Sequence, residues 1–240
     1  GKTRFESICA LRRKCAMIHF SLMQEAGLSV AAMSDKSDGD CGSRDEAVPN
    51  TEAFMTLAGA PDVRPVRVRQ VHGIAVVCAE EARGASLEAD GILLGKAGIA
   101  AGVSVADCAP VLLFDPLVRA GCLLHAGREG SFRNIAGTGV ALLTHRFGSQ
   151  PSSLVALIGP CAHGCCYEVS PELAAQWHRA GYACRDRFLD IPGTNSAQLE
   201  KAGVFRHNIH IVPHCTVCGG VFFSYRTDKT SNRNLVVMMV

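Results

Sequence analysis

The chain has 240 residues, 48% of them hydrophobic, and its 24 Lys and Arg side chains nearly balance 22 Asp and Glu side chains. This length allows a complete hydrophobic core, either in one large domain or in two small ones. The near-neutral charge excludes the basic surface that is typical of nucleic-acid-binding proteins. No apolar run reaches the ~20 residues that a membrane helix needs. We therefore expect neither a nucleic acid nor a membrane as partner.

Cysteine is unusually frequent, with 12 residues in the chain. Secreted domains use cysteines as disulfides, but such domains are usually short, and residues 1–6 lack the apolar segment of a signal peptide. Several cysteines, such as Cys15, Cys78 and Cys122, lie in apolar runs, where a free thiol packs as a small hydrophobic side chain. We therefore expect reduced thiols and a cytoplasmic location.

The first half of the chain predicts mainly strands, without a long linker or an internal repeat. Residues 8–28 are expected to hold a strand and a short helix, and residues 35–48 a loop. Apolar residues at helical spacing predict a helix over residues 45–60. Strands are expected over residues 65–71, 74–78, 89–95 and 98–106.

The second half predicts three helices among short extended segments. The helices are expected over residues 135–147, 170–180 and 194–203, and the second of them has Ser170 as N-cap and Pro171 at its first position. Extended segments are expected over residues 154–159, 188–191, 204–212 and 221–225. Since strands and helices are interspersed without regular alternation, we expect one α+β domain over residues 1–240.

Two apolar runs, residues 111–114 and 122–124, flank a turn signal at Asp115-Pro116. If these runs pair as a hairpin, Cys108 and His125 leave the sheet at the same end. A thiol and an imidazole held side by side form either a metal site or a nucleophile–base pair, as in a Cys–His hydrolase.

His72 also follows an apolar run, directly before Gly73, and is a third member of this candidate site. Two imidazoles and one thiolate fill three positions of a tetrahedral Zn²⁺ ion and leave one open, which is typical of catalytic zinc. Each residue taken alone has a simpler interpretation, since a strand-end histidine is often hydrogen-bonded in a core and a buried cysteine often serves packing.

An ordered set of short motifs runs from about Ser34 to the C-terminus. The motifs are Gln70-Val-His-Gly73, Ala89-Asp-Gly91, Ala106-Asp-Cys-Ala-Pro110 with Asp115, His125-Ala-Gly127, Ile158-Gly-Pro160, Cys166-Tyr-Glu-Val169 and Phe223-Ser-Tyr-Arg226. With them the sequence resembles the YfiH/laccase-domain family, whose members are named polyphenol oxidase or purine nucleoside phosphorylase. The resemblance implies a single layered α/β/β/α sandwich with mixed sheets. It also implies that His72, Cys108 and His125 hold the metal.

The resemblance further implies zinc-dependent phosphorolysis of adenosine, inosine, guanosine and methylthioadenosine, together with adenosine deamination. The implied partners are a purine nucleoside and phosphate. For phosphate we predict a cradle of Arg226 and the amides of residues 159–162, with Gln70 and Arg128 as further substrate-binding residues. A surface ion pair is the alternative for Arg226. Asp107 is expected to cap its own turn rather than to orient a ligand.

Residues 128–130 depart from the family pattern. Members usually continue His-Ala-Gly with Trp-Arg-Gly, whereas this chain has Arg128-Glu129-Gly130. A carboxylate therefore stands where the family has a cation, and phosphate binding here is either weakened or rebuilt around Arg128. Two alternatives stay open: a copper-dependent polyphenol oxidase, because copper also binds imidazole and thiolate, and a metal-stabilised interaction protein without catalysis.

The remaining cysteines predict no second metal site. Cys161, Cys165 and Cys166 surround His163, but neighbouring ligands such as Cys165 and Cys166 give poor geometry. The pair Cys215-Thr-Val-Cys218 matches a zinc half-site. No second half follows it in the nearby sequence, so we expect a reduced pair or a disulfide. Tyr167 and Trp177 are expected in the core.

Overall fold

The computed structural model describes residues 17–240, so the part of the first predicted segment before Met17 lies outside the described residues. The strands are β1 (Ile18–His19), β2 (Val30–Met33), β3 (Val76–Cys78), β4 (Gly91–Leu94), β5 (Ala100–Val105), β6 (Ala109–Asp115), β7 (Ala120–Ala126), β8 (Val155–Ile158), β9 (Cys184–Arg185), β10 (Phe188–Leu189), β11 (Ile209–Ile211) and β12 (Asn234–Met239). The α-helices are α1 (Ser21–Glu25), α2 (Val48–Leu57), α3 (Ala79–Ala82), α4 (Arg128–Phe132), α5 (Ile135–Phe147), α6 (Pro171–Arg179), α7 (Ile191–Lys201) and α8 (Tyr225–Asp228). Short 3₁₀ helices cover Lys36–Asp38, Asp45–Ala47, Pro151–Ser153 and Arg206–Asn208.

Two sheets form the centre of the molecule. One has the strand order β1-β2-β12-β5 and is antiparallel throughout. The other has the order β11-β8-β6-β7-β4-β3, with parallel pairs at its two edges and antiparallel pairs between them. The predicted α+β fold with mixed sheets is therefore confirmed.

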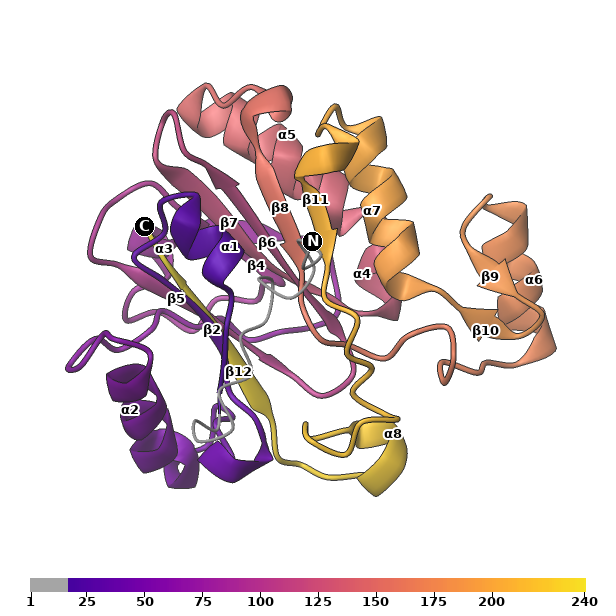
Figure 1. Ribbon diagram of the computed structural model, residues 1–240, viewed down its shortest axis with the longest axis horizontal. Coiled ribbons are helices and arrows are strands. Elements are labelled where there is room, and N and C mark those ends of the chain that lie inside the picture. The colour runs from indigo at the N-terminus through magenta and orange to yellow at the C-terminus, as the bar shows by residue number, and fades with distance from the viewer. Residues whose placement is uncertain (1–16) are drawn as a thin grey trace, which may run out of the picture.

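Helices cover the outer faces of both sheets, which gives four layers (Figure 1). Alternate side chains of β6 point to opposite faces, as the pleat requires. Leu112 and Phe114 belong to the cluster between the sheets, whereas Val111 and Leu113 join the cluster under α5 and α7. On the far side, α2 packs on the four-stranded sheet through a third buried cluster. The layered α/β/β/α sandwich is the arrangement that the family resemblance implies.

The β6–β7 hairpin has the predicted pairing. Asp115 pairs with Ala120 at the turn, and Pro110 pairs with His125 at the other end. The Asp115 carboxylate accepts a 2.9 Å hydrogen bond from the backbone N–H of Leu117, which stabilises the turn. Both strands are buried over their whole length, which explains their continuous apolar runs. Cys108 and His125 therefore leave the sheet at the same end.

Four predicted elements differ in the structure. Of the extended segment predicted over residues 204–212, only Ile209–Ile211 is a strand, because Arg206–Asn208 form a 3₁₀ helix. Residues 65–71 are extended but make only isolated bridges, at Val66 and Arg69. Of the predicted strand over residues 221–225, residues 221–224 form a loop and Tyr225 begins α8. The helix predicted from residue 194 begins at Ile191, because Asp190 caps it by accepting from the backbone N–H of Gly193 at 2.9 Å. Among residues 17–240, no helix combines the length and hydropathy needed to cross a membrane.

Candidate active site

The structure brings together the three residues that were predicted as a joint site. The ligand atoms of His72, Cys108 and His125 all lie within 4.8 Å of one another. The two imidazole rings meet edge to face, with centroids 4.9 Å apart and planes at 73°. His125 lies on β7, Cys108 directly precedes β6, and His72 lies in the loop before β3. His125 is buried, Cys108 is half-buried and His72 is exposed, so the cluster has one side open.

Asp90 holds both histidines in place and is the functional residue that the sequence reasoning missed. It is fully buried next to β4. Its carboxylate accepts from the backbone N–H of His72 at 3.0 Å and of Gly73 at 2.6 Å. The same carboxylate bonds to His125 Nδ1 at 2.8 Å. His72 has a φ of +60°, a left-handed conformation that is costly outside glycine, and these hydrogen bonds stabilise it. The motif Ala89-Asp-Gly91 was the available signal.

The bond to Asp90 also orients the ring of His125. A carboxylate at Nδ1 keeps the proton on that nitrogen, so Nε2 is the nitrogen that exchanges a proton or binds a metal. Metal-binding histidines in proteins are commonly held in this way by a buried carboxylate. Asp90 therefore prepares His125 either to bind a metal or to accept a proton.

Charges within the cluster shift the pKa values of its members. Burial alone would raise the pKa of Cys108, but the charge of His125 and hydrogen bonds from both histidines lower it to about 6. Burial alone would lower the pKa of His125, but the charge of Cys108 and the bond to Asp90 raise it to about 9. Cys108 is therefore held as a thiolate, the form that binds metals and attacks electrophiles.

Two glycines make room for this arrangement. A Cβ atom on Gly127 would lie 3.1 Å from the sulfur of Cys108 and 3.0 Å from a ring carbon of His72. A Cβ atom on Gly130 would lie 2.9 Å from the carbonyl oxygen of Gly73. The glycines of His125-Ala-Gly127 and Arg128-Glu129-Gly130 thus allow the start of α4 to pass close to the cluster.

A cavity of about 780 Å³ opens over the three residues. It is lined by six Arg and Lys side chains but only two carboxylates, which favours an anionic ligand. The predicted residues Gln70, Arg128 and Arg226 all line it. The full lining is Ser43, Arg67, Val68, Arg69, Gln70, His72, Ser104, Ala106, Asp107, Cys108, His125, Arg128, Glu129, Tyr167, Tyr225, Arg226, Lys229 and Arg233.

The predicted substrate-binding residues differ in how free their polar groups are. The Gln70 side chain exchanges two 2.8 Å hydrogen bonds with the backbone of Ser104, so it ties the His72 loop to β5. Arg128 forms a 3.4 Å ion pair with Glu129 at the cavity wall. Arg226 lies over the ring of Tyr167, 3.8 Å from its centroid, and pairs with no carboxylate among residues 17–240.

Two other expectations at this site were wrong. Asp107 does not cap its own turn; its carboxylate accepts from the Thr216 hydroxyl and from the backbone N–H of Arg226, both at 2.7 Å. The amides of residues 159–162 offer no phosphate cradle, because the N–H groups of Gly159 and Ala162 donate to backbone carbonyls. Trp177 is buried as expected, and Tyr167, which is half-buried, packs against the same core cluster and also lines the cavity wall.

Comparison with known families matches residues 19–240 to the model of the multi-copper polyphenol oxidoreductase laccase family. Similar proteins are named purine nucleoside phosphorylase. One from Streptomyces griseus is 31% identical over 90% of this chain and 91% of the relative. One from Streptomyces coelicolor is 35% identical over 77% of this chain and 78% of the relative.

Solved structures show the same architecture. The crystal structure of YlmD from Geobacillus stearothermophilus superposes with a TM-score of 0.87 at 25% identity, covering 97% of this chain and 98% of that one. A Bacillus licheniformis protein, YfiH, superposes with a TM-score of 0.83 at 22% identity, covering 95% and 98%. The second likeness supports the fold alone.

Proposed function

The chain belongs to the multi-copper polyphenol oxidoreductase laccase family, and from that premise we propose that it is a zinc-dependent purine nucleoside phosphorylase. Its substrates are phosphate and the nucleosides adenosine, inosine, guanosine and methylthioadenosine, and it also deaminates adenosine. The relatives' names support the enzyme class. The observation that carries the proposal is the cation-lined cavity above His72, Cys108 and His125, because it offers a metal-binding cluster and an anion site to one ligand.

The three residues fit a zinc ion in their donor chemistry. Two imidazole nitrogens and one thiolate are ligands that zinc prefers, and three protein ligands leave one position for a substrate or water. Cys108 is already a thiolate, since its pKa lies at about 6. When bound here, zinc supplies a Lewis acid that can polarise the purine or activate water. Asp90 would act through His125 and His72 by holding their rings in position.

Arg226 is the residue that we propose for phosphate. Its guanidinium is fixed on Tyr167 and donates one bond, at 3.0 Å, to the backbone carbonyl of Glu168. The remaining N–H groups can still form the two parallel bonds that arginine makes with phosphate. Tyr225, 52% exposed at the cavity, offers a ring face for a purine.

Base release in the presence and absence of phosphate tests this proposal. Purified protein is incubated with inosine or adenosine, and the free base is measured by chromatography. We expect hypoxanthine or adenine only when phosphate is present, and inosine from adenosine without it. A zinc-loaded protein that releases no base with phosphate would refute the phosphorylase assignment. Cys184→Ser serves as the control variant, because Cys184 is not part of the His72, Cys108 and His125 cluster.

The copper-dependent phenol oxidase is the second candidate, supported by the name of the family model. Reduction of dioxygen by a laccase needs several copper ions, most of them held by histidines. Among residues 17–240, only one potential metal cluster contains histidine, and it holds two. Copper analysis and a phenol-oxidation assay on the same sample separate the two candidates.

We also propose a cytoplasmic location. The ten cysteines of the described part of the chain form no disulfide, which supports reduced thiols. Reduced thiols are typical of cytosolic proteins.

A further inference from the structure

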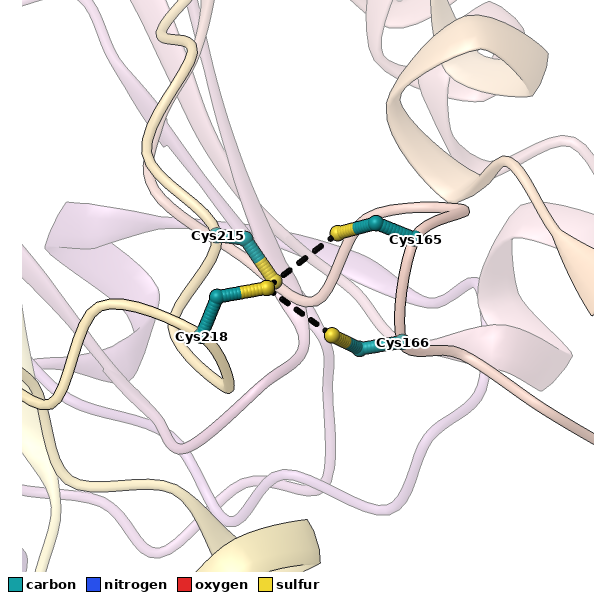
Figure 2. Close-up of side chains that lie close together, drawn as sticks. All are labelled: Cys165, Cys166, Cys215 and Cys218. Atoms are coloured by element: carbon teal, nitrogen blue, oxygen red, sulfur yellow. Dashed lines mark hydrogen bonds between the residues drawn. The ribbon is translucent and has the colours of Figure 1, made fainter.

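Four further cysteines form a cluster outside the candidate active site. The sulfur atoms of Cys165, Cys166, Cys215 and Cys218 all lie within 4.8 Å of one another. Figure 2 shows two side chains from each of two loops, with all four sulfurs pointing toward a common centre. One loop follows β8 and the other follows β11. The proposed function makes no use of this cluster.

The expectation that the Cys215–Cys218 half-site has no second half nearby was wrong. The second half is distant in sequence but adjacent in space, because β8 and β11 are parallel neighbours in the sheet. Parallel strands send their following loops out at the same edge. Cys161 and Cys215 continue this pairing as an isolated bridge, and the backbone N–H of Thr216 donates to the Cys161 carbonyl at 2.9 Å.

Although Cys165 and Cys166 are neighbours in sequence, both of their side chains can reach the same candidate metal site. The backbone N–H groups of Cys166 and Tyr167 both donate to the carbonyl of His163 at 2.9 Å, which closes a tight turn. Within this turn the side chains of Cys165 and Cys166 both approach Cys218. The sulfur of Cys218 lies 3.4 Å from that of Cys165 and 2.9 Å from that of Cys166.

These distances suit a small tetrahedral ion. Zinc–sulfur bonds of about 2.3 Å in a tetrahedron place the sulfurs about 3.8 Å apart. Two sulfur pairs, at 2.9 and 3.4 Å, are closer than this value, and no pair lies beyond 4.8 Å. Movements of about 1 Å, within the reach of side-chain rotation, would complete the tetrahedron.

Backbone N–H groups surround one of the four sulfurs. The N–H groups of His163, Val217 and Cys218 point at the sulfur of Cys215. Four thiolates at these distances would repel one another, and a bound divalent cation removes that repulsion.

We propose that Cys165, Cys166, Cys215 and Cys218 bind a zinc ion in a second, structural site. Four thiolate ligands close the coordination sphere, which distinguishes structural zinc from catalytic zinc. The ion fastens the loop after β8 to the loop after β11.

Both loops support the cavity of the candidate active site. Tyr167, directly after Cys166, carries the guanidinium of Arg226. Thr216, between the two other cysteines, donates to Asp107, which directly precedes Cys108. The zinc-bound loops therefore position both the phosphate-binding arginine and the residue next to the active-site thiolate, without touching the substrate.

Metal analysis of the full-length chain tests the second site. Zinc per chain is measured after dialysis in wild type, in Cys165→Ser/Cys218→Ser and in Cys184→Ser. The double variant is expected to lose one zinc relative to wild type, whereas Cys184→Ser loses none. This difference does not depend on whether the His72 cluster holds zinc. Failure of the second-site proposal can therefore be distinguished from failure of the proposed function. In His72→Ala/His125→Ala, one zinc is expected to stay bound.

A thiol count on the wild type keeps the test decisive if a variant fails to fold. The protein is unfolded in chelator without reductant and titrated with a thiol reagent. All 12 cysteines are expected to react, and their reaction in the folded protein is expected to accelerate when chelator removes the zinc. Two missing thiols, meaning a disulfide, would overturn the proposal. Equal zinc in wild type and Cys165→Ser/Cys218→Ser would also overturn it, as would iron in place of zinc.

Discussion

The two cysteine-containing clusters differ in what holds them in place. Cys108 and His125 stand at strand ends and His72 lies in the loop before β3, around a buried carboxylate that bonds to both histidines. The four-cysteine cluster lies between two loops, where the sulfur of Cys218 contacts those of Cys165 and Cys166. The first cluster is preorganised by the protein and opens on the cavity. In the second, the proposed ion adds to the backbone bridge between Cys161 and Cys215 in holding the two loops together.

This difference separates catalysis from stability within one small region. A cluster supported by secondary structure keeps its shape when one ligand is removed, so the substitution lowers catalytic activity. A cluster that connects two loops loses this connection when one ligand is removed, so the substitution lowers the free energy of unfolding. Substitutions at one residue of each cluster should therefore have opposite effects.

The largest effect is expected from Cys108→Ala. Removal of the thiolate deletes one of three ligands, and base release should fall to the level of the uncatalysed control. The unfolding temperature should stay within a few degrees of wild type, because Cys108 is half-buried at the cavity. Base release and thermal unfolding are measured on the same sample.

Cys218→Ser is the matched opposite. We expect a clearly lower unfolding temperature, while base release well below that temperature falls only in part, because the loops that carry Tyr167 and Thr216 become looser but keep their contacts with Arg226 and Asp107. The comparison fails if Cys218→Ser abolishes base release as completely as Cys108→Ala while the protein remains folded. It fails equally if Cys108→Ala retains activity.

Asp90→Asn tests whether preorganisation distinguishes the first cluster. An amide nitrogen cannot accept the backbone hydrogen bonds of the His72 loop, and at His125 Nδ1 it favours the wrong tautomer. We expect the affinity of the first site for zinc to fall about 10–100-fold, as measured by competition with a chelator. Asp115→Asn is the control, because Asp115 is equally buried but lies at the far end of the β6–β7 hairpin. An unchanged affinity in Asp90→Asn would show that the histidines need no buried carboxylate.

Much of the fold follows from local sequence. The β6–β7 hairpin was predictable because its register depends on one turn and two apolar runs. The segment 65–71 alternates like a strand, yet it makes only isolated bridges. Strand β12 was not predicted, although it pairs on both sides in the four-stranded sheet, since an apolar run at the end of a chain carries no pairing information. The single domain expected over residues 1–240 stays a prediction.

At the candidate sites, too, the sequence predicts what depends on local signals and not what depends on tertiary pairing. His72, Cys108 and His125 were predicted because two of them share a hairpin and all three lie in motifs of the family. The role of Asp90 depends on backbone N–H groups that only the folded loop presents to it. The four-cysteine cluster depends on the pairing of β8 with β11, which neither loop reveals. Local signals identify ligands within one element, whereas tertiary pairing decides which ligands meet.

Arg226→Gln tests whether the cavity above the first cluster binds phosphate, which the four-cysteine cluster is not expected to do. A hydrogen bond to a charged group contributes about 1.5–3 kcal/mol, so the KM for phosphate should rise about 10-fold or more. The KM for the nucleoside should change less, and Arg226→Lys should restore only part of the phosphate affinity because lysine lacks the planar fork. Arg206→Gln is the control, since Arg206 pairs with Glu200 outside the cavity. Equal changes in both KM values would contradict a specific phosphate role.

Glu129→Gln should give the smallest effect, in the opposite direction. Glu129 and its partner Arg128 are 47% and 37% exposed, and exposed pairs contribute about 0.2–1 kcal/mol. Removal of this carboxylate frees Arg128 and lessens repulsion of phosphate, so the KM for phosphate should fall up to about 5-fold. Arg128→Gln should raise it by a similar factor, and 0.5 M salt should reduce both effects. A rise in the phosphate KM of Glu129→Gln would mean that the carboxylate orients Arg128 toward the cavity. In that case Arg128 and Glu129 would act together in place of the family's Trp-Arg pair.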